Sequence, residues 1–191
     1  DEQIEMTVSP VELKETTYNE VSNYGVGFAP YFISLGLFVG SLLLTNVYPY
    51  VQPVGHPTNL WSWFASKSSI IAVVGVFQII FTYVLLKFGL GLEVQQEGWL
   101  ILTIVITSFA FLAIVQAFTV VLGDVGRFLA LVFLIVQLAG SAGTFPLELL
   151  PAPLQMVHEY LPMSYSVHAF RAAISTNDSA VLTQSLTTLG V

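Results

Sequence analysis

The side chains best suited to bind a metal are three histidines, and their spacing forms no ligand set. His56, His158 and His168 include no pair at the i, i+4 spacing that brings two imidazoles to one helix face. No His-Glu-x-x-His motif and no calcium-loop pattern of carboxylates occurs. Glu159 directly follows His158, and adjacent helical residues point to different faces. We therefore expect no metal site, and we interpret His158 as a histidine in contact with interfacial water.

The sequence also lacks the residues needed for nucleotide hydrolysis and for covalent catalysis. The chain has no cysteine, which excludes disulfides, thiolate ligands and cysteine nucleophiles. It has no Gly-x-x-x-x-Gly-Lys-[Ser/Thr] loop to bind nucleotide phosphates and no Gly-x-Ser-x-Gly elbow to present a serine. The sequence predicts a protein that is not an enzyme, with no catalytic residue and no cofactor.

The remaining polar candidates lie within or beside apolar segments. Gln116 and Gln137 are amides inside long apolar runs, where such side chains usually hydrogen-bond between helices; a role in a transport path is the alternative. Glu148 and Arg171 flank an apolar segment. Because an unpaired charge at the bilayer centre costs about 2.5–3.5 kcal/mol, both either face interfacial water or pair with each other.

The spacing of charges defines the elements that position these residues. The chain of 191 residues is 55% apolar and only 9% charged, against roughly 25% in soluble domains. No Asp, Glu, Lys or Arg occurs in 21–66, 68–86, 98–123 or 128–147. A bilayer core needs about 20 helical residues to cross. We predict an all-α polytopic membrane protein with spans over 28–48, 68–86, 98–122 and 128–143, and a net charge of −7 argues against nucleic acid as a partner.

Two features of the first half indicate contact surfaces. Gly36 and Gly40 form a small-xxx-small pair that lets another helix approach closely, as a packing face or a dimer interface. Residues 49–67 contain three prolines and then Asn59, which we predict to cap a short helix at headgroup depth. That helix would carry an aromatic belt or a partner-contact surface made of Trp61, Trp63, Phe64 and Lys67.

The segment 140–171 is apolar but repeatedly interrupted. Pro146, Pro151, Pro153 and Pro162 prevent one straight helix from running through it. Broken backbone at membrane depth must be buried in protein or line a cavity. We predict a re-entrant pair of helices in one leaflet, over about 153–161 and 163–174, each begun by a proline. A last helical pattern follows residue 179, and we expect a further span after it.

The ends of the chain are less constrained. Residues 1–20 are acidic, and the alternation of Ile4, Met6 and Val8 favours a strand; a disordered acidic leader is the alternative. The chain opens on Asp1 rather than Met, so we expect a piece of a longer protein. The five Lys and Arg residues do not fix the membrane orientation by themselves.

The broken segment also carries a resemblance to a known family. Gly-Thr-Phe-Pro-x-x-x-Leu-Pro followed by Leu-Pro-x-Ser-Tyr and an arginine resembles the post-span motif of ABC-2-type permeases. Its matching residues here are Gly143, Phe145, Pro146, Pro151, Pro162, Tyr165 and Arg171. With the opening run from Asn23 to Gly40, the chain resembles the C-terminal membrane domain of the phage infection protein (YhgE/Pip) family of Gram-positive bacteria.

The resemblance implies an architecture and two functions. Residues 1–20 would end an extracellular domain, 87–97 and 144–190 would be extracellular, and 49–67 and 123–127 would be cytoplasmic. The first implied function is a homodimeric permease that exports a substrate across the cell membrane with a separate ATPase, which would contact the 49–67 loop. The alternative is a non-transporting anchor of a cell-surface protein, as a phage receptor or a type VII secretion accessory.

Overall fold

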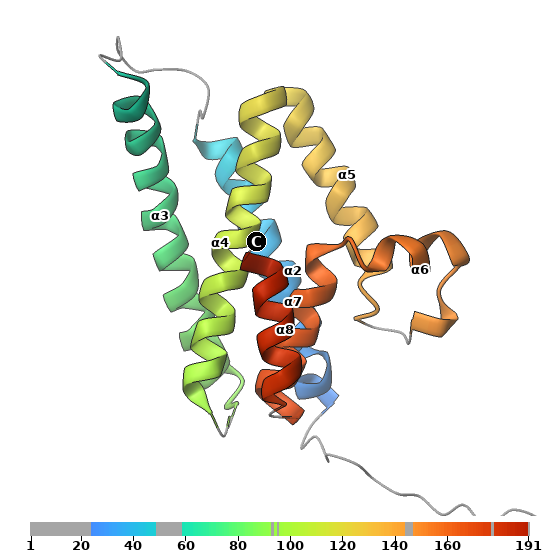
Figure 1. Cartoon of the computed structure of the whole chain (residues 1–191). Coiled ribbons are helices and arrows are strands. Elements are labelled where there is room, and N and C mark those ends of the chain that lie inside the picture. Colours follow the sequence, from blue (N-terminus) through green and yellow to red (C-terminus); the bar gives the residue numbers. More distant parts are fainter. Residues whose placement is uncertain are drawn as a thin grey trace, which may run out of the picture.

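The computed structural model describes residues 24–48, 59–92, 94, 96–143, 147–176 and 178–190, and every element in these ranges is helical (Figure 1). The strand or acidic leader predicted over 1–20 lies outside the described residues. In chain order the elements are α2 (Tyr24–Val47), α3 (Leu60–Val84), the π-helix η1 (Leu85–Gly89), α4 (Glu97–Leu122), α5 (Asp124–Gly140), the 3-10 helix η2 (Leu147–Leu149), α6 (Ala152–His158), α7 (Pro162–Arg171), the π-helix η3 (Ala172–Thr176) and α8 (Ser179–Gly190).

Three helical stretches are long and apolar enough to cross a membrane. They are Gly27–Val47, Ala65–Gly89 and Glu97–Leu122, and they overlap the first three predicted spans. The fourth predicted span corresponds to α5, which has 17 residues and is therefore about 25 Å long. The prediction of an all-helical membrane protein is confirmed, and α5 is shorter than its three companions.

The separate interfacial helix predicted near residues 59–67 does not exist. Asn59 does precede a helix in extended conformation, at φ −150° and ψ 145°, as predicted for a cap. That helix is α3, which then runs without interruption to Val84. Residues 60–67 contain neither proline nor glycine, so nothing in the sequence ends a helix before the apolar run begins.

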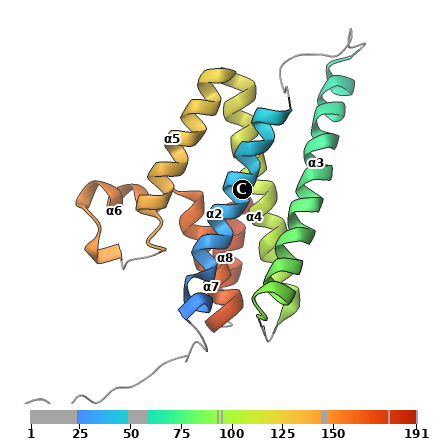
Figure 2. The same ribbon diagram turned by 180° about the vertical axis from the view of Figure 1, so that it is seen from behind.

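The bundle is organised around α4, which packs against α2, α3, α5, α7 and α8 (Figures 1 and 2). Two observations explain this position. The buried residues of α4 recur every three or four positions, so they form a broad stripe on one side of the helix, and several are small hydroxyl residues such as Thr103, Thr107 and Ser108. Small side chains allow neighbouring helices to approach closely.

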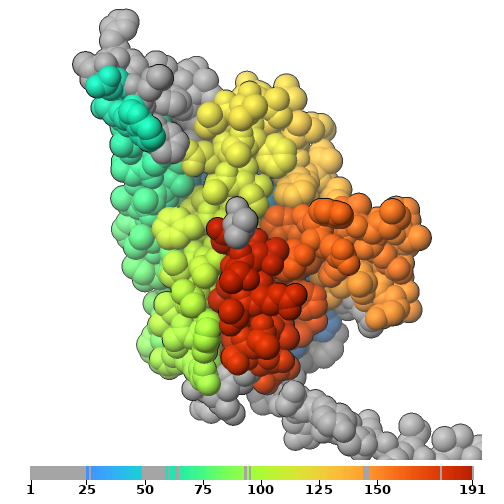
Figure 3. Space-filling view, viewed as in Figure 1, coloured from blue at the N-terminus to red at the C-terminus, as the bar shows by residue number. Residues whose placement is uncertain are grey.

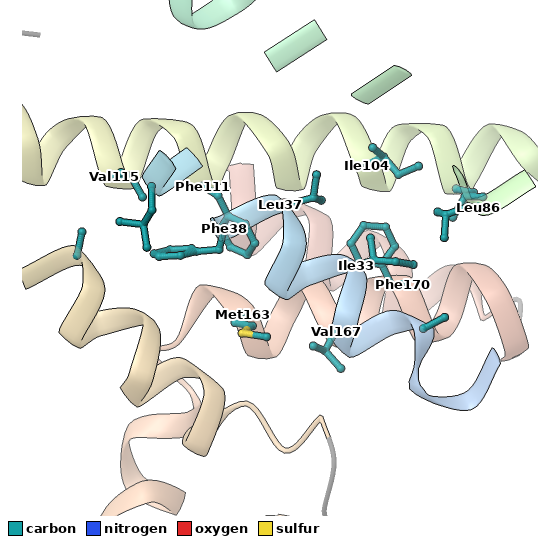
Figure 4. Close-up of a cluster of buried hydrophobic side chains, with 14 residues drawn as sticks. Ile33, Leu37, Phe38, Leu86, Ile104, Phe111, Val115, Met163, Val167 and Phe170 are labelled. Atoms are coloured by element: carbon teal, nitrogen blue, oxygen red, sulfur yellow. The ribbon is translucent and has the colours of Figure 1, made fainter. Parts of the chain in front are cut away.

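Aromatic and branched side chains fill the space between α2, α4 and α7 (Figure 4). Phe38 of α2 and Phe111 of α4 meet edge to face, with ring centroids 5.1 Å apart. Met163, Val167 and Phe170 of α7 complete the cluster and are fully buried. A second cluster joins α7 and η3 to α8 through Ala169, Ala173 and Leu182. The broken segment is thus part of the core rather than an appendage.

The turn between α4 and α5 depends on two glycines. Gly123 follows the last residue of α4 at φ 61° and ψ −130°, a conformation that favours glycine. At Gly126 a Cβ atom would lie 1.8 Å from the carbonyl oxygen of Phe118. Only a residue without a side chain therefore permits this close approach of the two helices.

The outer helix α3 is less buried than its neighbours. Only 17% of the most apolar 18-residue stretch of this helix is buried within the protein, against 50% for the corresponding stretch of α2 and 44% for that of α4. At its end, the π-helix η1 presents Lys87 to Glu97 at the start of α4, and the two form an ion pair. The hydroxyl of Tyr83 donates to the same carboxylate at 3.2 Å. Polar contacts at one end therefore hold α3 to α4.

Candidate functional site

The break after α5 is set by the contacts of two glycines. A Cβ at Gly140 would lie 2.5 Å from Leu161, which precedes α7. A Cβ at Gly143 would lie 2.1 Å from the ring of Tyr31 on α2. Between them, Ala142 adopts φ 49°, a left-handed conformation that costs a residue with a side chain about 1–2 kcal/mol. Close packing against α2 and α7 thus turns the chain at the end of α5.

His158 is buried, so its interpretation as a water-contacting interfacial histidine is wrong. Its exposed fraction is 8%, because it ends α6 against the broken end of α5. Its Nδ1 lies 2.6 Å from the carbonyl oxygen of Gly140 and 3.2 Å from Oγ of Ser164. The imidazole therefore links α5, α6 and α7. It hydrogen-bonds with a carbonyl oxygen that receives no N–H from its own helix, because α5 ends there.

Gln137 performs the interhelical role predicted for it. Its Oε1 accepts a hydrogen bond from the backbone N–H of Met163 at 3.1 Å, one of the first amides of α7. Pro162 is the first residue of α7, and Pro153 is the second of α6, as predicted. The side chain of Gln137 on α5 thus accepts a hydrogen bond from a backbone N–H at the start of α7 that has no partner within its own helix.

The side-chain amide of Gln116 is half-buried and has no hydrogen-bond partner within the described residues.

A hydroxyl pair links α7 to α2 in the interior. Ser166 Oγ lies 2.9 Å from Ser34 Oγ and 2.9 Å from the carbonyl oxygen of Met163. Ser34 in turn donates to the carbonyl oxygen of Pro30 at 2.9 Å. Both serines are fully buried. Sequence reasoning missed this pair, because isolated serines in an apolar segment do not indicate which helix they face.

The outer parts of the broken segment carry its other predicted residues. The hydroxyl of Tyr165 donates to the backbone carbonyl of Glu159 at 2.7 Å. Arg171 approaches the carbonyl of Gly143 at 3.5 Å and forms no ion pair with the exposed Glu148 within the described residues. Pro151 precedes α6 as its cap residue. Phe145 and Pro146 lie outside the described residues.

A second histidine lies beside His158. The two rings meet edge to face with centroids 6.0 Å apart, and His168 belongs to α7, outside the three candidate spans. Burial lowers the pKa of His168, and the neighbouring Arg171 and His158 lower it further. Among the described residues no group of three His, Cys, Asp or Glu side chains could hold a metal.

The short helix α6 forms a lobe on the side of the bundle (Figure 3). Several large apolar side chains of this lobe are exposed: Leu149, Met156 and Tyr160. Next to it, a groove of about 630 Å³ is lined by the middle of α4, the α6–α7 turn and the end of α8. Its floor is apolar, so it suits lipid chains or another helix rather than a polar ligand.

The two glycines predicted as a packing face differ in their surroundings. A Cβ at Gly40 would lie 3.1 Å from Nε2 of Gln78 on α3, whereas Gly36 has no atom within 4 Å of that position. Gln78 uses this room to donate to the carbonyl oxygen of Leu37 at 2.7 Å. Gly40 thus packs α2 against α3 within the chain. A dimer role for Gly36 stays a prediction.

The predicted partner-contact residues separate into two groups. Trp61 is 82% exposed in the first turn of α3, whereas Lys67 is buried with its ammonium 4.6 Å from the ring centroid of Tyr48. Lys67 therefore links α3 to the end of α2. The side chains of Trp63 and Phe64 lie outside the described residues. Partner contact by this group stays a prediction.

Comparisons with known proteins identify the class. A family model of the ABC-2 family transporter proteins matches residues 1–191. The chain belongs to this family of membrane proteins, which confirms the predicted resemblance.

A more specific relative is the "Uncharacterized protein YhgE" of Bacillus subtilis (strain 168). It is 42% identical over 184 residues, which cover 96% of this chain and 24% of that protein. The chain thus spans about a quarter of the length of the curated relative it matches. No solved structure matches the chain. The similarity and the apolar helices establish a bacterial membrane protein that contacts the lipid bilayer.

Substituting the two glycines tests the packing of α2 against α3. Gly40→Ala should displace Gln78 and break its bond to Leu37, at a cost of about 1 kcal/mol, which lowers the Tm of the purified protein. Gly36→Ala is the matched control and should leave the Tm unchanged or slightly higher. Equal loss in both variants would contradict the assignment of Gly40 to this contact.

Substituting His158 tests its role at the break. His158→Ala leaves the carbonyl of Gly140 unpaired and should cost about 1–3 kcal/mol, measured as a lower Tm. His158→Asn retains a donor close to the position of Nδ1 and should recover part of the loss. If Ala and Asn variants are equally stable, the hydrogen bond to Gly140 does not hold the break.

Proposed function

We propose that this chain is the membrane part of a permease-like subunit that dimerises and exports a substrate across the cell membrane of a Gram-positive bacterium with a separate ATPase. The observation that carries the proposal is the docking of α7, the second helix of the broken segment, inside the bundle, where Ser166 meets Ser34 and Met163 meets Gln137. Membership of the ABC-2 transporter family over the whole chain supports it.

The proposed arrangement in the membrane has four spans and a re-entrant helix pair. α4 has 26 residues and is about 39 Å long, enough to cross the hydrocarbon core of roughly 30 Å and to enter the headgroup regions. α5 starts from the same turn but is about 14 Å shorter, so the break and α6 lie within one leaflet. The buried hydrogen bonds of His158 and Gln137 support this depth, because broken backbone there needs protein partners.

The proposed orientation assigns the two ends of the bundle to opposite sides of the membrane. The end of α2, the start of α3 and the α4–α5 turn lie at one end, which we assign to the cytoplasm (Figure 1). The Lys87–Glu97 ion pair and the turn before α8 lie at the other end, outside the cell. The basic residues are divided between the two ends, with Lys67 and Arg127 toward the inner end and Lys87 and Arg171 toward the outer end, so the orientation rests on the family resemblance and not on the positive-inside rule.

Single cysteines test this topology, and the chain itself contains none. In intact cells a membrane-impermeant maleimide should label Asp178→Cys quickly and Asp124→Cys only after permeabilisation. Met156→Cys, on the exposed side of α6, should react slowly until detergent removes the bilayer. Fast labelling of Asp124→Cys would reverse the orientation, and equal rates for Met156→Cys and Asp178→Cys would put α6 in water.

The first turns of α3 supply the proposed ATPase contact. Trp61 projects from the cytoplasmic end of the helix and is 82% exposed. Tryptophan is enriched where proteins bind one another, because its large ring buries much surface at a small entropic cost. Lys67 one to two turns further fixes the direction of the helix through Tyr48, so the projecting end of α3 is held relative to α2.

Co-purification tests the ATPase partner. A P-loop protein should co-purify with the wild type from the native membrane, and Trp61→Ala, alone or with Trp63→Ala, should reduce its yield by about tenfold, the effect of losing one anchor residue. Phe88→Ala is the matched control, because Phe88 is 77% exposed at the opposite end of the same helical rod. Equal loss in Phe88→Ala would argue against a specific contact.

One observation favours a second function. The match covers only 24% of the Bacillus relative, so most of that protein lies outside this membrane part. A chain that mainly anchors an extracellular domain, as a phage receptor or a type VII secretion accessory, would need the same fold without an ATPase. A stable native complex that contains no ATPase would support this anchor function instead.

A further inference from the structure

A pocket lies between α2 and α5, toward the end of the bundle that carries the α4–α5 turn. Its volume is about 340 Å³, within the range of small-molecule sites. Its walls are apolar and come from both helices, with Leu43, Leu131 and Leu134 among them. Nearest the α4–α5 turn, Arg127 and Asn46 line the pocket in place of leucines, so its lining changes from apolar to polar along its length.

The charge of Arg127 is only partly satisfied by the protein. Its Nη1 donates to Asp124 Oδ1 at 2.9 Å, and that carboxylate is 95% exposed. Its Nε is buried and has no hydrogen-bond partner within the described residues. An exposed ion pair of this kind contributes about 0–1 kcal/mol, so the guanidinium remains able to exchange Asp124 for a stronger anion.

The depth of these groups matches that of a lipid headgroup. Asn46 precedes the last residue of α2, and Arg127 lies in the first turn of α5, next to the turn at Gly123. The leucines of the pocket lie one to two turns further into apolar helices. A molecule with an anionic head and an apolar chain therefore meets the cation and the apolar walls at the same time.

We propose that this pocket binds an anionic phospholipid, with the phosphate on Arg127 and Asn46 and one acyl chain between α2 and α5. Guanidinium groups form strong, directional hydrogen bonds with phosphate oxygens, and basic pockets between membrane helices bind anionic headgroups. The charge of Arg127 selects an anionic lipid over a zwitterionic one. This site is independent of any ATPase and of the transported substrate.

Lipid selectivity in nanodiscs tests the site on the full-length protein. When phosphatidylglycerol replaces part of the phosphatidylcholine, the Tm of the wild type should rise and purified samples should retain phosphatidylglycerol. Arg127→Gln should lose this preference, about tenfold in affinity for one charged hydrogen bond. Arg171→Gln is the matched control and should keep it. Soluble glycerol phosphate should not raise the Tm, because it lacks the acyl chain.

Two further variants separate the lipid site from a general charge effect. Asp124→Asn removes the competing carboxylate and should strengthen the preference for phosphatidylglycerol. Leu131→Trp should fill the pocket and weaken it, whereas Ile135→Trp, one turn along the exposed face of α5 and outside the pocket, should not. The proposal is overturned if Arg127→Gln and Arg171→Gln respond alike, if Asp124→Asn weakens the preference, or if glycerol phosphate alone reproduces the stabilisation.

Discussion

The structure depends on how a broken helix is satisfied inside apolar surroundings. Ending α5 at Gly140 leaves carbonyls without helical partners, and starting α7 at Pro162 leaves amides in the same condition. The imidazole of His158 hydrogen-bonds with one of these carbonyls, that of Gly140, and the side-chain oxygen of Gln137 accepts a hydrogen bond from one of these amides, that of Met163. His158 lies on α6 and bonds to α5, while Gln137 lies on α5 and bonds to α7. These two hydrogen bonds therefore also fix how α5, α6 and α7 lie relative to one another. The rest of the bundle then closes around α7.

The interior of the bundle combines two kinds of packing. Large side chains such as Phe38, Phe111 and Phe170 fill the space between α2, α4 and α7, while serines and threonines allow the backbones to approach where the helices are closest. Hydroxyl groups bonded within their own helix, such as Ser41 to the carbonyl of Leu37 at 2.9 Å, add no unpaired polar group to the core. Ser41 and Thr119 are satisfied within their own helices and Ser166 also bonds to Ser34 of α2, whereas the hydroxyls of Thr107 and Ser108 have no hydrogen-bond partner within the described residues.

Much of this fold could be predicted from the sequence, and the limits have physical causes. Charge-free runs locate helices, because a charge in lipid is costly, so the main elements and the proline-started helices follow directly. Gln137 was identifiable because an amide in an apolar run needs a partner. The continuity of α3 was also available in the sequence, because residues 60–67 contain neither proline nor glycine. The burial of His158 and the Gln78–Gly40 contact were not predictable. Each depends on which distant helix a side chain faces, and a single periodic pattern does not contain that information.

The sparse attachment of α3 has a mechanical consequence. In lipid, moving an apolar helix away from its neighbours exposes no surface to water, so the hydrophobic effect offers little resistance to the displacement. The restraints on α3 are the Gln78 bond to α2, the close fit of Gly75 against Leu112, the Lys67–Tyr48 contact and the Lys87–Glu97 ion pair. Ile71, Ile79 and Leu86 of the same helical stretch also pack into the apolar clusters. A displacement of α3 is therefore opposed by these local contacts and by van der Waals packing, and not by exclusion of water.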